Sequence, residues 1–419
     1  MVKKNLTLSF FSALAKIFGG IGIISLLARV FSLSDFGNFT YALTLGTIFS
    51  LIIDYGFNIK IIKDVSSNTT NTNDITSVAI TSKFFLLVLT TLLFFTVNVF
   101  LDNNIEVILT GFFMFLSLVM FSFINTFLSV FKGKKEYKKD LKVVILDNFV
   151  TVIIVALVAL WTKNIQYTAI SFFLSKIVGL IYVYKVYKQT NTLIRPSLIE
   201  IKKDLYKALP YAVHYWVGSL YLNIDTVIMK PMVSSEDLGL YQAGIRIIIG
   251  LGVLLTIINS VYLPLLNEAL LKNIKEFKKK VISLNTNVLR IAVICTLGLI
   301  ICSKLVILVL FGEKFIELQN IFWIIALIVG MRIIGASFGI LLTISNKQAL
   351  RAIAGAISII LIIICDLLLI PSYGYKVAAI VLLFAHLFIT SFYMISIYAE
   401  YKTLFMPSFK KLFTAKIEL

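Results

Sequence analysis

Residues 34–42 read SDFGNFTYA, and residues 236–244 read EDLGLYQAG. Both stretches contain the pattern Asp-apolar-Gly-x-aromatic, and each follows the first long apolar run of its half of the chain. Residue n of the first copy corresponds to residue n + 202 of the second, which is about half of the 419 residues. The repeat predicts a chain built from two similar halves. We expect each Asp-x-Gly element to form a tight turn between helices.

The composition excludes an ordinary soluble domain. Hydrophobic residues make up 59% of the chain and charged residues only 14%, with a mean hydropathy of +0.97. A soluble protein of this size cannot bury that much apolar surface, so we expect a polytopic membrane protein. The first apolar run, about residues 6–30, is too long for the core of a signal peptide, so we interpret it as a retained span.

Apolar runs of roughly 20 residues predict an all-α fold of about twelve transmembrane helices. We expect them near residues 7–30, 39–60, 78–101, 105–131, 142–161, 167–187, 208–230, 240–266, 281–310, 317–344, 351–370 and 376–399.

The longest polar segment, residues 188–207, separates these spans into six and six. We therefore expect four parts: an N-terminal six-helix lobe (1–187), a cytoplasmic linker (188–207), a C-terminal six-helix lobe (208–399) and a cytoplasmic tail (400–419). An even number of spans per half inserts both halves in the same sense. This arrangement predicts lobes related by a pseudo-twofold axis along the membrane normal, around a central cavity.

The basic residues predict the orientation. The net charge is +18, and the Lys and Arg residues concentrate in segments on one side of the predicted spans, chiefly 132–142, 185–207, 272–280 and 402–416. Basic loops stay in the cytoplasm, so we expect both termini there. The positive charge then reflects loops that face an anionic leaflet, rather than nucleic-acid binding.

Ionisable residues within the spans are the candidate functional residues, because such groups usually face a cavity or a partner. The positive candidates predict a cationic lumen that attracts an anionic group, and arginine suits phosphate in particular. They are Lys16, Arg29, Lys176, Arg246, Arg290 and Arg332. The alternative for the deep cations is structural pairing with carboxylates. Four other charged residues (Asp54, Lys83, Asp147 and Glu268) lie near the cytoplasmic ends of spans, where we expect them to snorkel or pair at the interface.

Asp225, His214 and Asp366 are the candidates for ion coupling. Asp225 either holds Lys230 or an arginine of another helix, or carries a transported proton or sodium ion. Each histidine within a span either bonds a neighbouring helix or relays protons.

Several enzyme classes are excluded by missing motifs. The chain has no G-x-x-x-x-G-K-[ST] loop and no H-E-x-x-H, and no soluble segment is large enough to form an enzyme domain. Its three cysteines, Cys295, Cys302 and Cys365, lie in apolar runs and imply no disulfide framework. We therefore expect a transporter that uses no cofactor or metal.

Several motifs resemble the multidrug/oligosaccharidyl-lipid/polysaccharide exporter superfamily. In the first half, Leu27-Ala-Arg-Val-Phe31 precedes Leu33-Ser-Asp-Phe-Gly37, and Asp54-Tyr-Gly-Phe57 precedes Lys63-Asp64. The second half contains Asn223-Ile-Asp-Thr-Val-Ile-Met229, Leu238-Gly-Leu-Tyr241 and Phe311-Gly-Glu-Lys-Phe315. Within this superfamily the chain resembles more closely the polysaccharide-repeat-unit flippases of O-antigen export, the Wzx type. The usual Leu-Gly-Pro before the acidic pair is replaced here by Phe31-Ser-Leu-Ser34.

The resemblance implies a flippase of the bacterial inner membrane that works by alternating access. Its substrate would be an oligosaccharide on undecaprenyl pyrophosphate, moved from the cytoplasmic to the periplasmic leaflet. Membrane lipids, a coupling proton or sodium ion and a polysaccharide polymerase are the further partners implied. Two rival functions stay open: a multidrug/cation antiporter of the same superfamily, which would favour a lumen rich in carboxylates, and, more remotely, a membrane-embedded polysaccharide polymerase.

Overall fold

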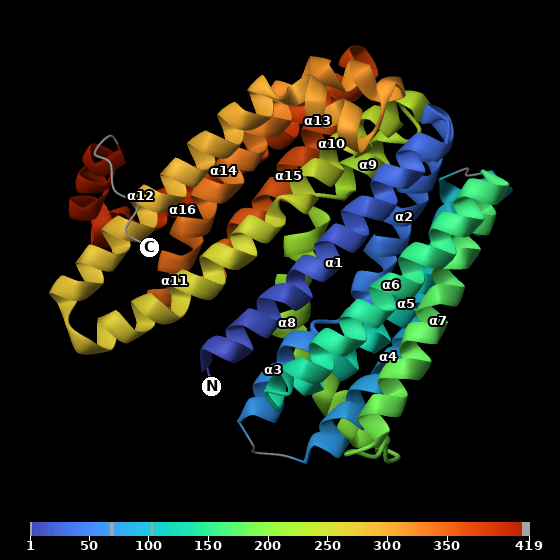
Figure 1. Cartoon of the computed structure of the whole chain (residues 1–419), viewed down its shortest axis with the longest axis horizontal. Coiled ribbons are helices and arrows are strands. Elements are labelled where there is room, and N and C mark those ends of the chain that lie inside the picture. Colours follow the sequence, from blue (N-terminus) through green and yellow to red (C-terminus); the bar gives the residue numbers. More distant parts are fainter. Residues whose placement is uncertain (1, 68–70, 102–103, 413–419) are drawn as a thin grey trace. The chain divides into compact units, whose positions relative to one another are not determined.

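The computed structural model describes residues 2–67, 71–101 and 104–412, and these residues form helices joined by short connections, with no strand among them. The chain divides into two compact units, Met1–Gly239 and Leu240–Leu419 (Figure 1). This division lies after the segment 188–207, where the sequence placed the boundary between lobes. The helices that follow that segment pack with the first unit, and the six-plus-six assignment of spans stays a prediction.

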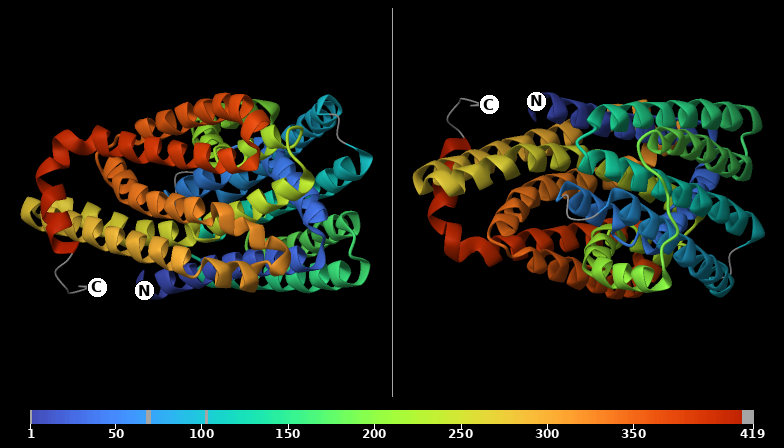
Figure 2. Two further views of the ribbon diagram at one scale, coloured as in Figure 1. Left: turned by 90° about the horizontal axis from the view of Figure 1, so that it is seen from above. Right: turned by 90° about the horizontal axis from the view of Figure 1, so that it is seen from below.

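The first unit contains nine helices among its described residues. They are α1 (Val2–Val30), α2 (Leu33–Asp54), α3 (Phe57–Ser66), α4 (Thr72–Phe100), α5 (Ile105–Gly133), α6 (Tyr137–Thr162), α7 (Ile165–Lys188), α8 (Leu198–Leu220) and α9 (Ile224–Met229). Helix α5 is the centre of the packing, because it contacts α2, α3, α4 and α7. Helices α6 and α7 run side by side, and α1 packs along α6 (Figure 1, Figure 2).

The second unit is also helical. Its elements are α10 (Ser235–Gly250, which begins in the first unit), α11 (Gly252–Lys272), α12 (Ile274–Ile301), α13 (Ser303–Leu310), the short 3-10 helix η1 (Glu313–Leu318), α14 (Gln319–Ile344), α15 (Gln348–Tyr373) and α16 (Tyr375–Leu412). Helix α14 packs against both α12 and α16, and α15 packs mainly against α16.

Ten helical segments of the described chain are long and apolar enough to cross a membrane. The predicted spans 7–30 and 208–230 are not among them: α1 is helical there, but several of its side chains lie outside the described set, and α8 carries Lys202, Lys203 and Asp204. Large apolar side chains also cover outer faces of the bundle, as on α6, where Phe149 is 65% exposed. A multi-pass membrane protein explains this surface, because hydrocarbon solvates what water would not.

Four predicted spans are interrupted. The expected helix over 208–230 breaks into α8 and α9 at residues 221–223, the helix over 240–266 breaks at Leu251, and the helix over 281–310 breaks at Cys302. The expected helix over 39–60 breaks into α2 and α3 at residues 55–56. Glycines flank the second break at Gly250 and Gly252, and paired small residues are a common cause of helix kinks. The predictions of continuous helices were wrong here because hydropathy stays high across each break.

The predicted linker is also partly helical, because α8 begins within it. The Ser197 hydroxyl accepts from the Glu200 N–H at 3.3 Å, and the Glu200 carboxylate accepts from the Ser197 N–H at 2.7 Å. This capping box fixes the start of α8. The hydrogen bonds from Ser197 favour the ionised carboxylate and lower the pKa of Glu200.

The two copies of the repeated motif begin helices rather than form the tight turns we expected. Ser32 accepts from the Asp35 N–H at 3.0 Å at the start of α2, and Ser234 accepts from the Asp237 N–H at 3.1 Å at the start of α10. Each serine is therefore a helix N-cap, and each aspartate lies in the first turn, where the helix dipole favours negative charge. The serines, like the aspartates, correspond by the n + 202 relation.

The first turns of α2 and α10 cross each other at the repeated glycines. A Cβ placed on Gly37 would overlap the Ser235 carbonyl oxygen, and a Cβ on Gly239 would lie 2.6 Å from the Leu33 carbonyl oxygen. Leu33 and Ser235 also correspond by the n + 202 relation, so each copy presents the same contact to the other. Such reciprocity is the property of a twofold-related contact. The two glycines are required because backbone meets backbone at this crossing.

Candidate functional site

Two lysines predicted to bind substrate come together around one aromatic ring of the first unit. The Lys16 ammonium of α1 lies 5.5 Å from the ring centre of Phe121 on α5, and the Lys176 ammonium of α7 lies 5.3 Å from it. At these distances the ring face attracts each cation. We call Lys16, Phe121, Asn125, Asp147 and Lys176 the Phe121 cluster.

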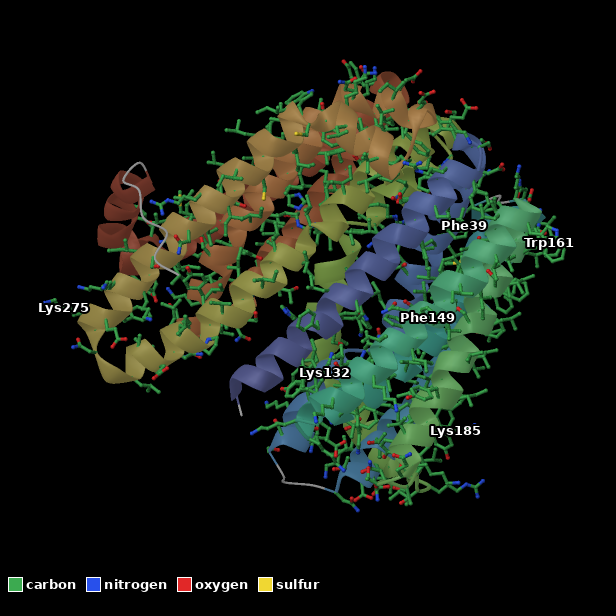
Figure 3. All side chains as sticks on the ribbon, viewed as in Figure 1. Phe39, Lys132, Phe149, Trp161, Lys185 and Lys275 are labelled. Atoms are coloured by element: carbon green, nitrogen blue, oxygen red, sulfur yellow. The ribbon has the colours of Figure 1, made fainter. Side chains whose placement is uncertain are left out.

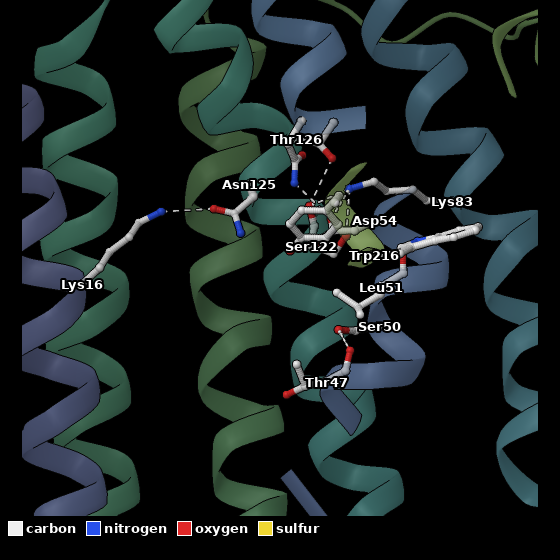
Figure 4. A network of polar contacts seen from close by, with 12 residues as sticks. Lys16, Thr47, Ser50, Leu51, Asp54, Lys83, Ser122, Asn125, Thr126 and Trp216 are labelled. Atoms are coloured by element: carbon white, nitrogen blue, oxygen red, sulfur yellow. Dashed lines mark hydrogen bonds and ion pairs between the residues drawn. The ribbon is translucent and has the colours of Figure 1, made fainter. Parts of the chain in front are cut away.

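The polar partners of these lysines differ. Lys176 is 8% exposed and donates to Asp147 of α6 at 2.7 Å. Lys16 instead donates to the Asn125 amide oxygen of α5 at 3.2 Å (Figure 4). The pairing alternative is thus observed for Lys176. Two ammonium groups and one carboxylate leave the Phe121 cluster with an excess of positive charge, which favours an anionic ligand.

Close helix packing positions this cluster. Gly179 of α7 has no side chain, and a Cβ there would overlap the Asp147 carboxylate, so α7 approaches α6 closely one turn beyond Lys176. Helix α1 is held to α6 by the Ser12 hydroxyl, which donates to Asp140 at 2.8 Å. The Asn148 amide nitrogen of α6 is buried without a hydrogen-bond partner among the described residues, and its side chain faces Gly19, one turn along α1 from Lys16. It is a further unused donor beside the cluster.

A second polar network, around Asp54, is fully internal to the first unit (Figure 4). Lys83 of α4 is 0% exposed and lies 3.1 Å from the carboxylate of Asp54, which is 7% exposed. Lys83 also donates to the Ser122 hydroxyl at 2.8 Å, and that hydroxyl donates to Asp54 at 2.5 Å. The sequence placed these charges at the membrane interface. Asp54 and Lys83 do pair with each other, which was one of the two expected outcomes, but the pair lies inside the helix bundle rather than at the membrane interface.

The Asp54 network also anchors α8. Tyr215 donates to the second Asp54 oxygen at 3.2 Å. The Trp216 indole N–H donates to the Leu51 carbonyl at 2.7 Å (Figure 4). Farther along, Lys60 of α3 bridges Asp64 at 2.7 Å and Asp204 of α8 at 2.5 Å. These contacts explain why α8 belongs to the first unit, which sequence reasoning missed. The sequence signal for this packing was the set of polar side chains on α8, namely Asp204, Tyr215 and Trp216, which need partners on neighbouring helices.

The remaining cations are more dispersed. Arg29 is an exposed residue of α1, thirteen residues or about 20 Å along the helix from Lys16, so it is not part of the Phe121 cluster. In the second unit Arg246 of α10 donates to Gln242 at 3.1 Å, and its Nε is buried without an acceptor among the described residues. Arg332 of α14 likewise has a buried, unaccepted Nη1 and faces Gly252 just after the break at Leu251. Arg290 is a half-buried residue of α12.

The ion-coupling candidates lie on three elements. His214 is exposed on α8, Asp225 is buried at the start of α9, and Asp366 is fully buried on α15. Lys230, one suggested partner of Asp225, donates to Asn38 at 2.6 Å and to Ser235 at 3.1 Å. It therefore ties the end of α9 to the crossing of the repeated motifs. Within the described part of the chain, no three His, Cys, Asp or Glu side chains gather as metal ligands would.

The sequence comparison decides the family. The profile of the family described as "Polysaccharide biosynthesis protein" matches residues 2–270, which is more than half of the chain. The chain belongs to the polysaccharide biosynthesis protein family. A search of curated protein sequences finds none that matches it.

Several solved structures share the fold of this chain. The chain is similar to the lipid II flippase MurJ in an inward closed conformation, with a TM-score of 0.72, 14% identity, and coverage of 97% of this chain and 92% of that one. It is also similar to an inward-facing multidrug resistance MATE transporter of the MOP superfamily (TM-score 0.65, 11% identity, 96% of each chain). The chain is similar as well to a MATE transporter of Vibrio cholerae, with a TM-score of 0.64, 13% identity, and coverage of 99% of this chain and 98% of that one. This polysaccharide biosynthesis protein therefore has the fold of membrane transporters.

Proposed function

We propose that this polysaccharide biosynthesis protein is a flippase of the Wzx type. It moves an oligosaccharide carried on undecaprenyl pyrophosphate, such as an O-antigen repeat unit, from the cytoplasmic to the periplasmic leaflet of the bacterial inner membrane. It works by alternating access between two six-helix lobes related by a pseudo-twofold axis, with twelve spans and both termini in the cytoplasm. Family membership and the flippase-like fold support this proposal.

The observation that carries the proposal is the excess of cationic groups that have spare hydrogen-bonding capacity inside the helical units. Among the described residues, Lys16 has only an amide oxygen and a ring face as contact partners, and Arg246 and Arg332 each hold a buried N–H that no described residue accepts. Buried donors without acceptors are costly unless a ligand satisfies them. A pyrophosphate supplies several anionic oxygens, and the guanidinium fork matches them.

The charge distribution also favours this function over that of a multidrug/cation antiporter. A multidrug/cation antiporter needs carboxylates to receive its substrate, but two of the buried carboxylates, Asp147 and Asp54, are engaged by lysines. Asp225, His214 and Asp366 are the proposed coupling residues for a proton or sodium ion. In this proposal a polysaccharide polymerase is a partner that uses the translocated oligosaccharide.

Alanine variants in a strain that lacks its own repeat-unit flippase test the proposal. Lys16→Ala, Arg246→Ala and Arg332→Ala are suitable because none of these residues forms an ion pair with a described carboxylate. A charge-assisted hydrogen bond is worth about 1.5–3 kcal/mol, so we expect each variant to restore about 10-fold to 100-fold less surface polysaccharide than the parent chain.

The matched control is Lys279→Ala, which removes an exposed lysine of α12 and should restore polysaccharide fully. Membrane abundance of every variant is measured alongside. Full restoration by all three core variants at normal abundance would eliminate the cationic mechanism. Export of cationic dyes by the parent chain, with no polysaccharide restored, would favour the antiporter instead.

A further inference from the structure

A groove lies between α6 and α7 at one end of the first unit. Its lining includes Lys139, Lys142, Tyr182, Lys185, Val186 and Gln189, and its volume is about 260 Å³. Lys185 and Lys132 lie at this end of the unit, whereas Trp161 lies at the other (Figure 3). Lys139 is bridged to Glu136 at 2.9 Å. Lys142 and Lys185 are exposed and have no ion pair within the described part of the chain.

A second groove lies on the other side of the same end of α6, between α6 and α1. It measures about 510 Å³, and five of its seven lining residues are apolar, with Leu8, Leu141, Ile145 and Phe149 among them; the other two are Lys138 and Lys142. Lys142 lines both grooves. Lys142 therefore lies where the basic groove meets the largely apolar groove.

The apolar groove continues along an exposed apolar face of α6, which we expect to meet lipid. Ile145, Phe149, Ile153 and Leu157 are exposed and follow one another at four-residue spacing, so they form one stripe along the helix. The stripe ends near Trp161, which is 91% exposed. Exposed tryptophan is typical of the membrane interface, so the stripe runs from one interface, at Lys142, to the other.

The same arrangement occurs on α7. Leu174, Val178 and Ile181 are exposed at helical spacing, and Lys185 follows them one turn later. Lys142 lies in the second turn of α6, near the N-terminal end of this helix. An occupant therefore has to combine a negative head group with a long apolar chain.

We propose that this end of the first unit binds one anionic glycerophospholipid. Its phosphate lies between Lys142 and Lys185, and one acyl chain follows Ile145 and Phe149 along α6. Basic recesses between transmembrane helices on the cytoplasmic side are a recognised kind of site for anionic lipid head groups. This lipid site is separate from the Phe121 cluster and does not depend on which substrate the protein moves.

Native mass spectrometry of the purified full chain tests the site, with phosphatidylglycerol and phosphatidylcholine as the two probes. We expect one phosphatidylglycerol to be retained in preference to phosphatidylcholine. The Lys142→Gln/Lys185→Gln variant should bind phosphatidylglycerol about 30-fold more weakly, because each of the two lysines near an anionic lipid is worth about 1 kcal/mol. Both residues are exposed, so the variant should fold like the parent chain.

The control is Lys278→Gln/Lys279→Gln, which removes the same charge from exposed positions of α12. Those lysines line a recess that contains Glu276 and belongs to one end of a single helix, so the control should keep parental affinity. Equal weakening by both double variants would show general charge attraction and overturn the proposal. Equal retention of the two lipids by the parent chain, or unchanged binding by Lys142→Gln/Lys185→Gln, would overturn it as well.

Discussion

The Gly37→Ala variant is expected to lose stability and transport, whereas Gly20→Ala should keep both. The added methyl group at Gly37 would overlap the Ser235 carbonyl oxygen, and neither backbone can move without displacing the first turn of its helix. Overpacking of this kind costs about 1–3 kcal/mol, and the rigid partner places this site at the upper end. The thermal midpoint of the detergent-solubilised protein should fall by about 5 °C or more.

Gly20 is the matched control because a Cβ on it meets nothing within 4 Å. Alanine in this helix interior should be neutral or stabilising by up to about 1 kcal/mol. Gly239→Ala should behave like Gly37→Ala with a smaller effect, since its added atom would lie 2.6 Å from the Leu33 oxygen. Parental stability in both Gly37→Ala and Gly239→Ala would show that the two repeated motifs do not cross as described.

Removing one partner of the Asp54–Lys83 pair should have the other large effect. Lys83 is 0% exposed, so Asp54→Asn leaves its ammonium buried without a compensating charge. Loss of one member of a buried pair costs about 3–5 kcal/mol. The double variant Asp54→Asn/Lys83→Met should recover much of that loss, because it removes both charges together.

The exposed pair between Lys347 and Glu400 provides the comparison, with side chains that are 36% and 42% exposed. Lys347→Met should cost no more than about 1 kcal/mol. The measurement is the thermal midpoint of Asp54→Asn, of Asp54→Asn/Lys83→Met and of Lys347→Met, each compared with that of the parent chain. If Asp54→Asn were no more damaging than Lys347→Met, the Asp54 network would not be a buried ion pair.

Local sequence patterns predicted much of this fold. Long apolar runs predicted helices, and the repeated Asp-x-Gly motif identified two segments that contact each other at Gly37 and Gly239. The role of the motif was misjudged because Asp and Gly are common in turns. The N-cap serines, Ser32 and Ser234, are the local signal that distinguishes a helix start.

The ion-pair partners of the buried lysines were less predictable from the sequence. Hydropathy places Lys83 and Lys176 within spans, but it does not say which carboxylate of another helix each one meets. Those pairs depend on helix rotation and close packing, as where Gly179 lets α7 approach Asp147. The breaks at Leu251 and Cys302 also escaped prediction, since apolar residues continue through both.

Reconstitution into vesicles tests the central claim most directly. Purified protein is incorporated with a fluorescent undecaprenyl-pyrophosphate oligosaccharide, and a membrane-impermeant glycosidase reports how much of it has crossed the bilayer. We expect protein-dependent translocation that is at least about 10-fold slower with Arg332→Ala and unchanged with Lys279→Ala. A parent chain that leaves the oligosaccharide in its original leaflet while transporting a cationic dye would contradict the account.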